Sequence, residues 1–145
     1  MKASDFFNQQ EQQEIKEAIL AAEKDTSGEI RVHLEKNCKC DAFEHAIKVF
    51  EELGMTKTEQ RNAVLFFFLI EKKAFVILGD KGIDAVVPAH FWDTTKDMML
   101  EYFKRGNYKD GLVKGILSAG KQLKEHFPYQ KSDSNELPDD ISFGG

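Results

Sequence analysis

Residues 63–70 read AVLFFFLI, and after the charged stretch EKK a second apolar run, AFVIL, follows at residues 74–78. A continuous apolar run of this length is typical of a strand that is covered on both faces of its sheet. The connection is too short for a crossover, so the two runs predict an antiparallel hairpin. We therefore expect helices on both faces, with the phenylalanines at 66–68 alternating between two layers of core.

A second strand is predicted upstream of the hairpin. Apolar and polar residues alternate from Ile30 to Leu34, which is typical of a strand with one face toward water. Between this strand and the hairpin, apolar residues at helical spacing from Phe43 to Phe50 predict a helix that ends near Gly54. Because a helix connects the two strands, they should be parallel and the crossover right-handed. The predicted sheet is therefore mixed.

Helical spacing also predicts the helices that cover the sheet. Asn8 and Glu11 are placed as in a capping box, which predicts a helix over about residues 9–24. Asp93 is expected to cap a third helix, and a fourth covers about residues 112–123. The predicted fold class is α/β, a three-layer α/β/α sandwich with a mixed central sheet.

The apolar pattern stops near Pro128. We therefore predict one domain over residues 1–127, followed by an acidic, flexible C-terminal tail over residues 128–145. Residues after about Gln130 are expected to pack poorly, because they show no apolar periodicity.

Composition excludes several classes of partner. The chain has 145 residues and a net charge of −5, and its lysines and arginines are scattered among the acids. Nucleic acid is therefore an unfavourable partner, since phosphate binding needs concentrated positive charge. No apolar stretch approaches the length of a membrane-spanning helix or a signal peptide, so we expect no membrane insertion and a cytoplasmic location.

The two cysteines, Cys38 and Cys40, lie in a polar loop. A C-x-C pair can bind a metal or exchange disulfides, but both uses generally need further ligands or a helix N-terminus that lowers the thiol pKa. The expectation from sequence is two free thiols in a reducing compartment.

Four segments resemble the TPM domain family. They are TSGEIRV at residues 26–32, RNAVL at 61–65, GDKGID at 79–84 and YKDGL at 108–112. Their order along the chain matches the family, which commonly has Asn-Asn-Gly-Val-Leu in the second segment and Gly-Tyr-Gly-Leu-Glu in the third. This sequence departs from that pattern at Arg61, Ala63 and Asp84, and has one additional residue in the third segment.

The resemblance implies an α/β/α sandwich with a divalent-cation site, occupied by calcium, among acidic residues near one edge of the sheet. It also implies an acid phosphatase activity and an association with membrane-protein assembly or repair. Some family members lie beside genes for LemA-type coiled-coil membrane proteins, which makes a LemA-type protein the partner that the resemblance suggests.

The turn after the hairpin supplies the candidate ligands. Asp80 and Asp84 should lie together at one sheet edge, and two carboxylates favour a hard cation such as calcium. Calcium takes six to eight oxygens, so Asn62, Asp93 or backbone carbonyls would have to join them. Glu29 is expected at the opposite end of its strand. The alternative is that these side chains only cap helices and close turns.

Catalytic groups are sparse. The histidines lie in separate segments without H-x-x-x-H spacing, and no serine stands in a G-x-S-x-G elbow. A phosphatase would need metal-bound water and cationic groups for the phosphate, for which Lys81 and Arg61 are candidates. The favoured function is therefore a noncatalytic cytoplasmic binding or adaptor module that binds a divalent cation. The alternative is a metal-assisted phosphomonoester hydrolase.

Overall fold

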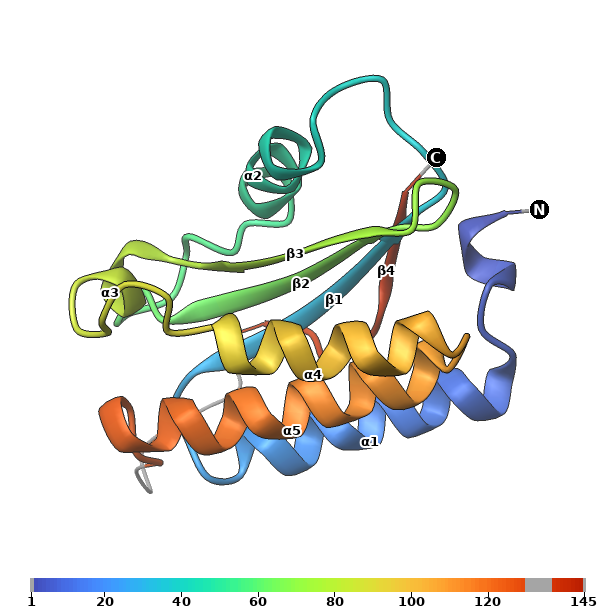
Figure 1. Cartoon of the computed structure of the whole chain (residues 1–145). Helices are drawn as coiled ribbons and strands as arrows, with labels where there is room; N and C mark the ends of the chain where they lie inside the picture. The colour runs from blue at the N-terminus through green and yellow to red at the C-terminus, as the bar shows by residue number, and fades with distance from the viewer. Residues whose placement is uncertain (1, 130–136, 145) are drawn as a thin grey trace.

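The computed structural model describes residues 2–129 and 137–144. Their sheet has four strands in the order β3-β2-β1-β4 (Figure 1). The strands are β1 (Glu29–Glu35), β2 (Ala63–Leu69), β3 (Ala74–Gly79) and β4 (Ser142–Gly144). β1 is parallel to β2, and β2 is antiparallel to β3. The predicted crossover pair and hairpin are therefore confirmed, and the sheet is mixed.

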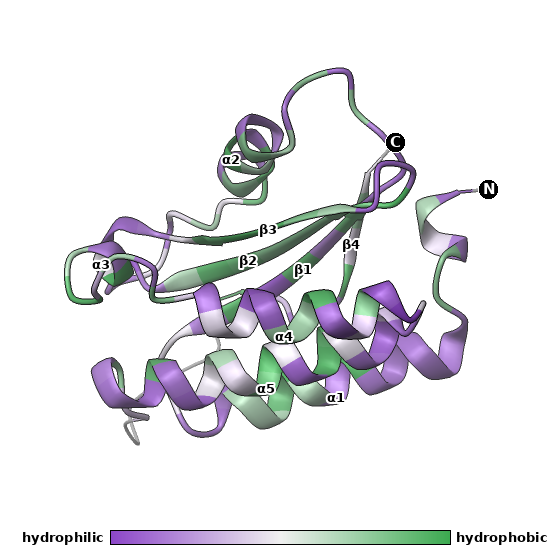
Figure 2. Cartoon of the chain, viewed as in Figure 1, coloured by the Kyte–Doolittle hydropathy of each residue, from purple (hydrophilic) through white to green (hydrophobic). Residues whose placement is uncertain are grey.

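Helices cover both faces of the sheet, as Figure 1 shows. The helix α2 (Ala42–Glu52) lies on one face. The other face is covered by three long helices, namely α1 (Gln9–Glu23), α4 (Asp93–Lys104) and α5 (Tyr108–His126). The apolar colouring of Figure 2 is concentrated on the strands and the sides of the helices that face them. The α/β/α sandwich is confirmed.

The phenylalanine run divides between the two layers of core. Phe66 and Phe68 join the apolar cluster formed with α1, α4 and α5, whereas Phe67 joins the cluster beneath α2. All seven residues of β2 are buried. Alternation of side chains along a strand that is covered on both faces explains this division.

Local signals set the helix starts. Asn8 accepts a hydrogen bond from the Glu11 amide at 2.8 Å, and Glu11 accepts one from the Asn8 amide at 3.0 Å, so the predicted capping box is present. Asp41 caps α2 by accepting from the amides of Phe43 and Glu44. Asp93 does not cap α4. Trp92 occupies the N-cap position without a side-chain hydrogen bond.

The prediction that β1 has one face toward water is wrong. Glu29, His33 and Glu35 alternate with its apolar residues, yet all three are buried. The α2 layer covers this face, and the His33 ring stacks on Phe67 with the ring planes 4° apart. Alternation of apolar and polar residues shows that the two faces of a strand differ in polarity. It does not show that the polar face is exposed, because polar side chains with hydrogen-bond partners can also be buried.

The prediction that residues after about Gln130 pack poorly is wrong for residues 137–144. Leu137 is buried in the cluster beneath α2, and β4 pairs in parallel with β1, with Ser142 opposite His33. Asp140 forms an ion pair with Lys16 of α1 at 3.0 Å. A strand of three residues has no detectable periodicity, because its stability comes from pairing with a distant segment. Residues 130–136 of the predicted tail lie outside the described residues.

Two short helices were not predicted. One is the 3-10 helix at Ala3–Asp5, and the other is α3 (Lys81–Asp84), which occupies the segment expected to be a turn. Among the residues described, none of the helices has the length and apolar character needed to cross a membrane.

Candidate functional site

Three of the TPM-like segments, at residues 26–32, 61–65 and 79–84, meet at one end of the sheet. The Asp80 amide donates to the Ala63 carbonyl at 2.9 Å, and the Glu29 amide donates to the Asn62 carbonyl at 3.4 Å. The expectation that Glu29 lies at the opposite end is therefore wrong, because the parallel pairing sets Glu29 beside Ala63. This edge is formed by the amino ends of β1 and β2 and the carboxyl end of β3. We call Asn62, Asp80 and Asp84 the acidic corner.

Asp80 is already bound to a cation within the chain. Its Oδ2 accepts a hydrogen bond from Arg61 Nε at 2.6 Å, and its Oδ1 accepts one from Arg61 Nη2 at 2.9 Å. The two residues therefore form a bidentate ion pair. Asp80 also caps α3 by accepting from the Lys81 amide at 2.8 Å. The hydrogen bond to Asp80 raises the pKa of Arg61 above its ordinary value. Both oxygens of Asp80 are thus in use.

A glycine allows α3 to lie against the turn before β2. The Gly82 amide donates to the Arg61 carbonyl at 2.9 Å. A Cβ at Gly82 would lie 2.1 Å from the Gln60 carbonyl oxygen and 2.5 Å from that of Arg61. The close approach of these two backbones brings Arg61 within reach of Asp80.

Asn62 joins the corner to the first TPM-like segment. The residue is 1% exposed, and its Nδ2 donates to Ser27 Oγ at 3.3 Å. Its Oδ1 accepts a hydrogen bond from none of the described residues. A buried acceptor without a donor is unfavourable, so this oxygen is available to a ligand.

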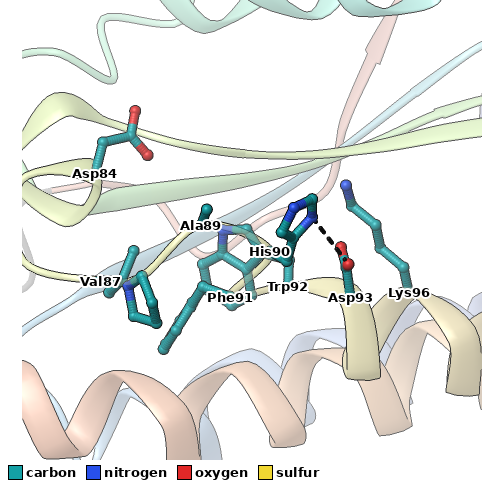
Figure 3. A pocket seen from close by; sticks show the side chains of 9 residues that line it. Asp84, Val87, Ala89, His90, Phe91, Trp92, Asp93 and Lys96 are labelled. Carbon is teal, nitrogen blue, oxygen red and sulfur yellow. Dashed lines mark ion pairs between the residues drawn. The ribbon is translucent and has the colours of Figure 1, made fainter.

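Asp84 lies on the outer side of the corner and lines a cavity of about 480 Å3. Burial, and then the charge of Asp80, raise the pKa of Asp84. The cavity is also lined by Asp93, whose Oδ2 pairs with His90 Nδ1 at 3.2 Å, and by Lys96. Figure 3 shows Asp84 on one side of the cavity and the His90–Asp93 pair on the other, with Ala89 between them. Asp84 and Asp93 therefore share a cavity but do not form one ligand shell.

The corner fits a hard cation in part. Asp84, Asn62 Oδ1 and backbone carbonyls are oxygen donors of the kind that calcium prefers, but six to eight are needed. Asp80 can contribute only if its ion pair with Arg61 opens. Arg61 stands where the family commonly has asparagine, so this chain supplies a guanidinium in place of a neutral ligand.

A second cluster lies near the other end of β1, and only its two cysteines were considered as metal ligands from the sequence. Cys38, Cys40 and His45 each offer a ligand atom, and these atoms lie within 4.8 Å of one another. Their spacing, C-x-C-x4-H, was the available signal. It is visible only when cysteines and histidines are counted together.

Comparison with known proteins agrees with the fold. The TPM domain profile matches residues 1–122. The BA42 protein of the psychrophilic bacterium Bizionia argentinensis is 50% identical, with a TM-score of 0.93 over 99% of each chain. A search of curated proteins found no match.

Two more distant solved structures share the fold alone. The N-terminal domain of a protein from P. gingivalis is 16% identical, with a TM-score of 0.69 over 88% of this chain and 83% of that chain. The N-terminal domain of the cg2496 protein from Corynebacterium glutamicum is 12% identical, with a TM-score of 0.64 over 97% of this chain and 81% of that chain. Since the family profile covers most of the sequence, the chain belongs to the TPM domain family.

Proposed function

We propose that this chain is a noncatalytic, cytoplasmic binding module of the TPM domain family whose acidic corner takes calcium weakly, in competition with Arg61. The observation that carries the proposal is the buried Oδ1 of Asn62, which accepts no hydrogen bond from the described residues at an edge that also holds Asp80 and Asp84. An oxygen acceptor and two carboxylates at one edge are suited to a hard cation.

Arg61 sets the strength of that binding. Its guanidinium neutralises Asp80 and occupies both carboxylate oxygens. A calcium ion must either displace Arg61 or bind with fewer charged ligands, and both lower its affinity. Weak, millimolar binding is therefore expected.

The substitution Arg61→Asn tests this competition. Asparagine tolerates the positive φ of 52° at this position and frees the Asp80 carboxylate. We expect it to tighten calcium binding by about tenfold, which corresponds to about 1.4 kcal/mol. Asp84→Asn should abolish binding, because it removes a charged ligand. The measurement is the rise in melting temperature with added calcium, since a ligand of the folded state stabilises that state.

Lys81→Asn is the matched control. Lys81 is exposed beside the corner, so this change removes the same charge as Arg61→Asn but leaves Asp80 paired. It should alter calcium binding much less. If both substitutions tightened calcium binding equally, the cause would be net charge and not the release of Asp80. If calcium left the melting temperatures of wild type and Arg61→Asn unchanged, calcium binding would be excluded.

A second candidate function rests on the cavity. Asp84, the His90–Asp93 pair and Lys96 surround about 480 Å3, which can admit a phosphomonoester. A metal-assisted hydrolase would use these acids for the metal and Lys96 for the phosphate. Hydrolysis of a generic phosphomonoester with calcium, magnesium or manganese, lost in both Asp84→Asn and His90→Asn, would favour the hydrolase over the binding module.

The proposed partner is a membrane-associated LemA-type protein. A purified LemA-type protein from the same genome should bind the chain, and calcium should strengthen that binding in wild type but not in Asp84→Asn. No binding with or without calcium would exclude this partner.

A further inference from the structure

The loop between β1 and α2 brings thiols and an imidazole together. Cys38 and Cys40 lie in this loop, and Cys38 Sγ donates to the Cys40 carbonyl at 3.1 Å. His45 is in the first turns of α2, where its amide donates to the carbonyl of the capping residue Asp41 at 3.0 Å. The cap on α2 therefore fixes the position of His45 relative to the loop.

Glu35 prepares His45 as a ligand. One oxygen of this buried carboxylate, Oε2, pairs with His45 Nε2. A carboxylate accepts hydrogen bonds, so the neutral form of His45 carries its proton on Nε2 and keeps the lone pair of Nδ1 for an ion. Metal-binding histidines commonly donate their second ring N–H to a carboxylate in this way. This contact is an independent observation in favour of a metal site.

Glu35 is itself held in place from two sides. Its Oε1 pairs with His33 Nε2 at 3.0 Å, and His33 Nδ1 bonds to Ser142 Oγ of β4 at 2.7 Å. Burial lowers the pKa of His33, although its hydrogen bond to Glu35 acts in the opposite direction. Gly144 packs so closely that a Cβ there would lie 2.2 Å from Glu35 Oε1.

The donor set selects the class of metal. Two cysteines and one histidine are the ligands of zinc-type sites, and calcium and magnesium prefer oxygen. Donor atoms in such sites lie about 2.0–2.3 Å from zinc, so the present separations of up to 4.8 Å must shorten by roughly 1 Å. Cys40 is exposed on the loop, where a small movement achieves this. Three protein ligands leave a fourth position for water or an outside ligand.

We propose that Cys38, Cys40 and His45 form a three-ligand site for a zinc-class metal ion, with Glu35 as the positioning residue for His45. The site is separate from the acidic corner, because the corner is at the amino end of β1 and the Cys-Cys-His cluster follows its carboxyl end.

Cobalt titration of the reduced, full-length chain tests the site. We expect one Co2+ per chain, with a sulfur-to-cobalt charge-transfer band and the intense visible bands of tetrahedral cobalt, both lost on adding Zn2+. Cys38→Ser and Cys40→Ser should each weaken binding about tenfold or more and reduce the charge-transfer band. His45→Ala should weaken binding similarly but retain that band. Glu35→Gln should lower affinity by about 10–100-fold without changing the spectrum.

The controls separate this site from other histidines and from the proposed calcium corner. His126→Ala changes an exposed histidine outside the cluster and should leave cobalt binding unaltered. Cobalt binding should also be unaltered in Asp84→Asn and in wild type with excess calcium. The double variant Cys38→Ser/Cys40→Ser should keep the calcium response of wild type. Absence of the charge-transfer band, or equal cobalt affinity in wild type and this double variant, would overturn the proposal. Binding of Cu(I) without binding of Zn2+ or Co2+ would overturn the assignment to zinc.

Discussion

Glu23, the last residue of α1, is an acid in a position that disfavours its charge. Burial raises its pKa to about 10, and a hydrogen bond with Asp139 and the charges of Glu29 and Asp139 act in the same direction. The Ile30 amide, which donates to Glu23 Oε2 at 2.9 Å, opposes them. The carboxyl group is therefore protonated in the folded protein at neutral pH and ionised in the unfolded chain.

Protonation of Glu23 makes stability depend on pH. Between its unfolded value of 4.5 and its folded value of about 10, the folded state binds more protons. The contribution of Glu23 to the free energy of unfolding is therefore most favourable below pH 4.5. It is lost as the pH rises through the folded pKa. Glu23→Gln keeps an acceptor for Ile30 without the ionisation, so we expect it to stabilise the protein at pH 8 by about 1 kcal/mol or more and to have little effect at pH 4. Urea unfolding across this range is the measurement. A destabilised variant at pH 8 would contradict it.

Gly82 is a position where any side chain should destabilise the fold. Because its missing Cβ would meet two backbone oxygens, Gly82→Ala should destabilise the protein by about 1–3 kcal/mol and open the Arg61–Asp80 pair. Gly79→Ala is the control, since a Cβ there makes its nearest contact at 3.4 Å, with a side-chain atom of Ile83. Chemical denaturation compares the two variants, and equal losses would count against the close backbone approach.

Among the elements, β4 shows what a short strand can contribute. It pairs with only His33, Leu34 and Glu35 of β1, yet it places Ser142 and Gly144 against the buried histidine and glutamate. Leu137, which precedes it, adds an apolar contact in the cluster beneath α2. The segment is therefore part of the packed domain.

Matched substitutions in this segment test its packing. Leu137 is 8% exposed and Phe143 is 38% exposed. Leu137→Ala should destabilise the domain by about 2–5 kcal/mol, because it leaves a cavity. Phe143→Ala should have a much smaller effect, within about 1 kcal/mol. Thermal unfolding measures both. A Leu137→Ala variant as stable as wild type would support the prediction from sequence that residues 137–144 pack poorly.

Local patterns allowed the central elements to be predicted, but long-range contacts escaped prediction. The run at residues 63–70 and its short turn specify a buried hairpin, because length and hydrophobicity are local properties. The burial of His33 and Glu35 depends on α2 and β4, which are distant in sequence. The pairing of Arg61 with Asp80 likewise requires the approach of α3, and the Cys-Cys-His cluster requires the β1–α2 loop to fold back.

At the scale of the whole molecule, β1 connects the two proposed ion sites. Its seven residues span roughly 20 Å, with the acidic corner at one end and the Cys-Cys-His cluster beyond the other. Sites at this separation without shared ligands should act independently.

Independence predicts additive stabilisation by the two ions. Calcium and zinc together should raise the free energy of unfolding by the sum of their separate effects, within about 0.5 kcal/mol. Unfolding by urea with each ion alone and with both measures this sum. A combined effect no larger than that of zinc alone would indicate that the ions compete for one site.

The pairing of β1 with β4 has a consequence for synthesis on the ribosome. His33 and Ser142, which meet across this pair, are 109 residues apart, so β1 emerges long before the strand that borders it. Until then, the outer edge of β1 presents unpaired N–H and C=O groups to neighbouring nascent chains. β4 closes this edge once it has emerged, and chaperone protection is most valuable to the protein before then.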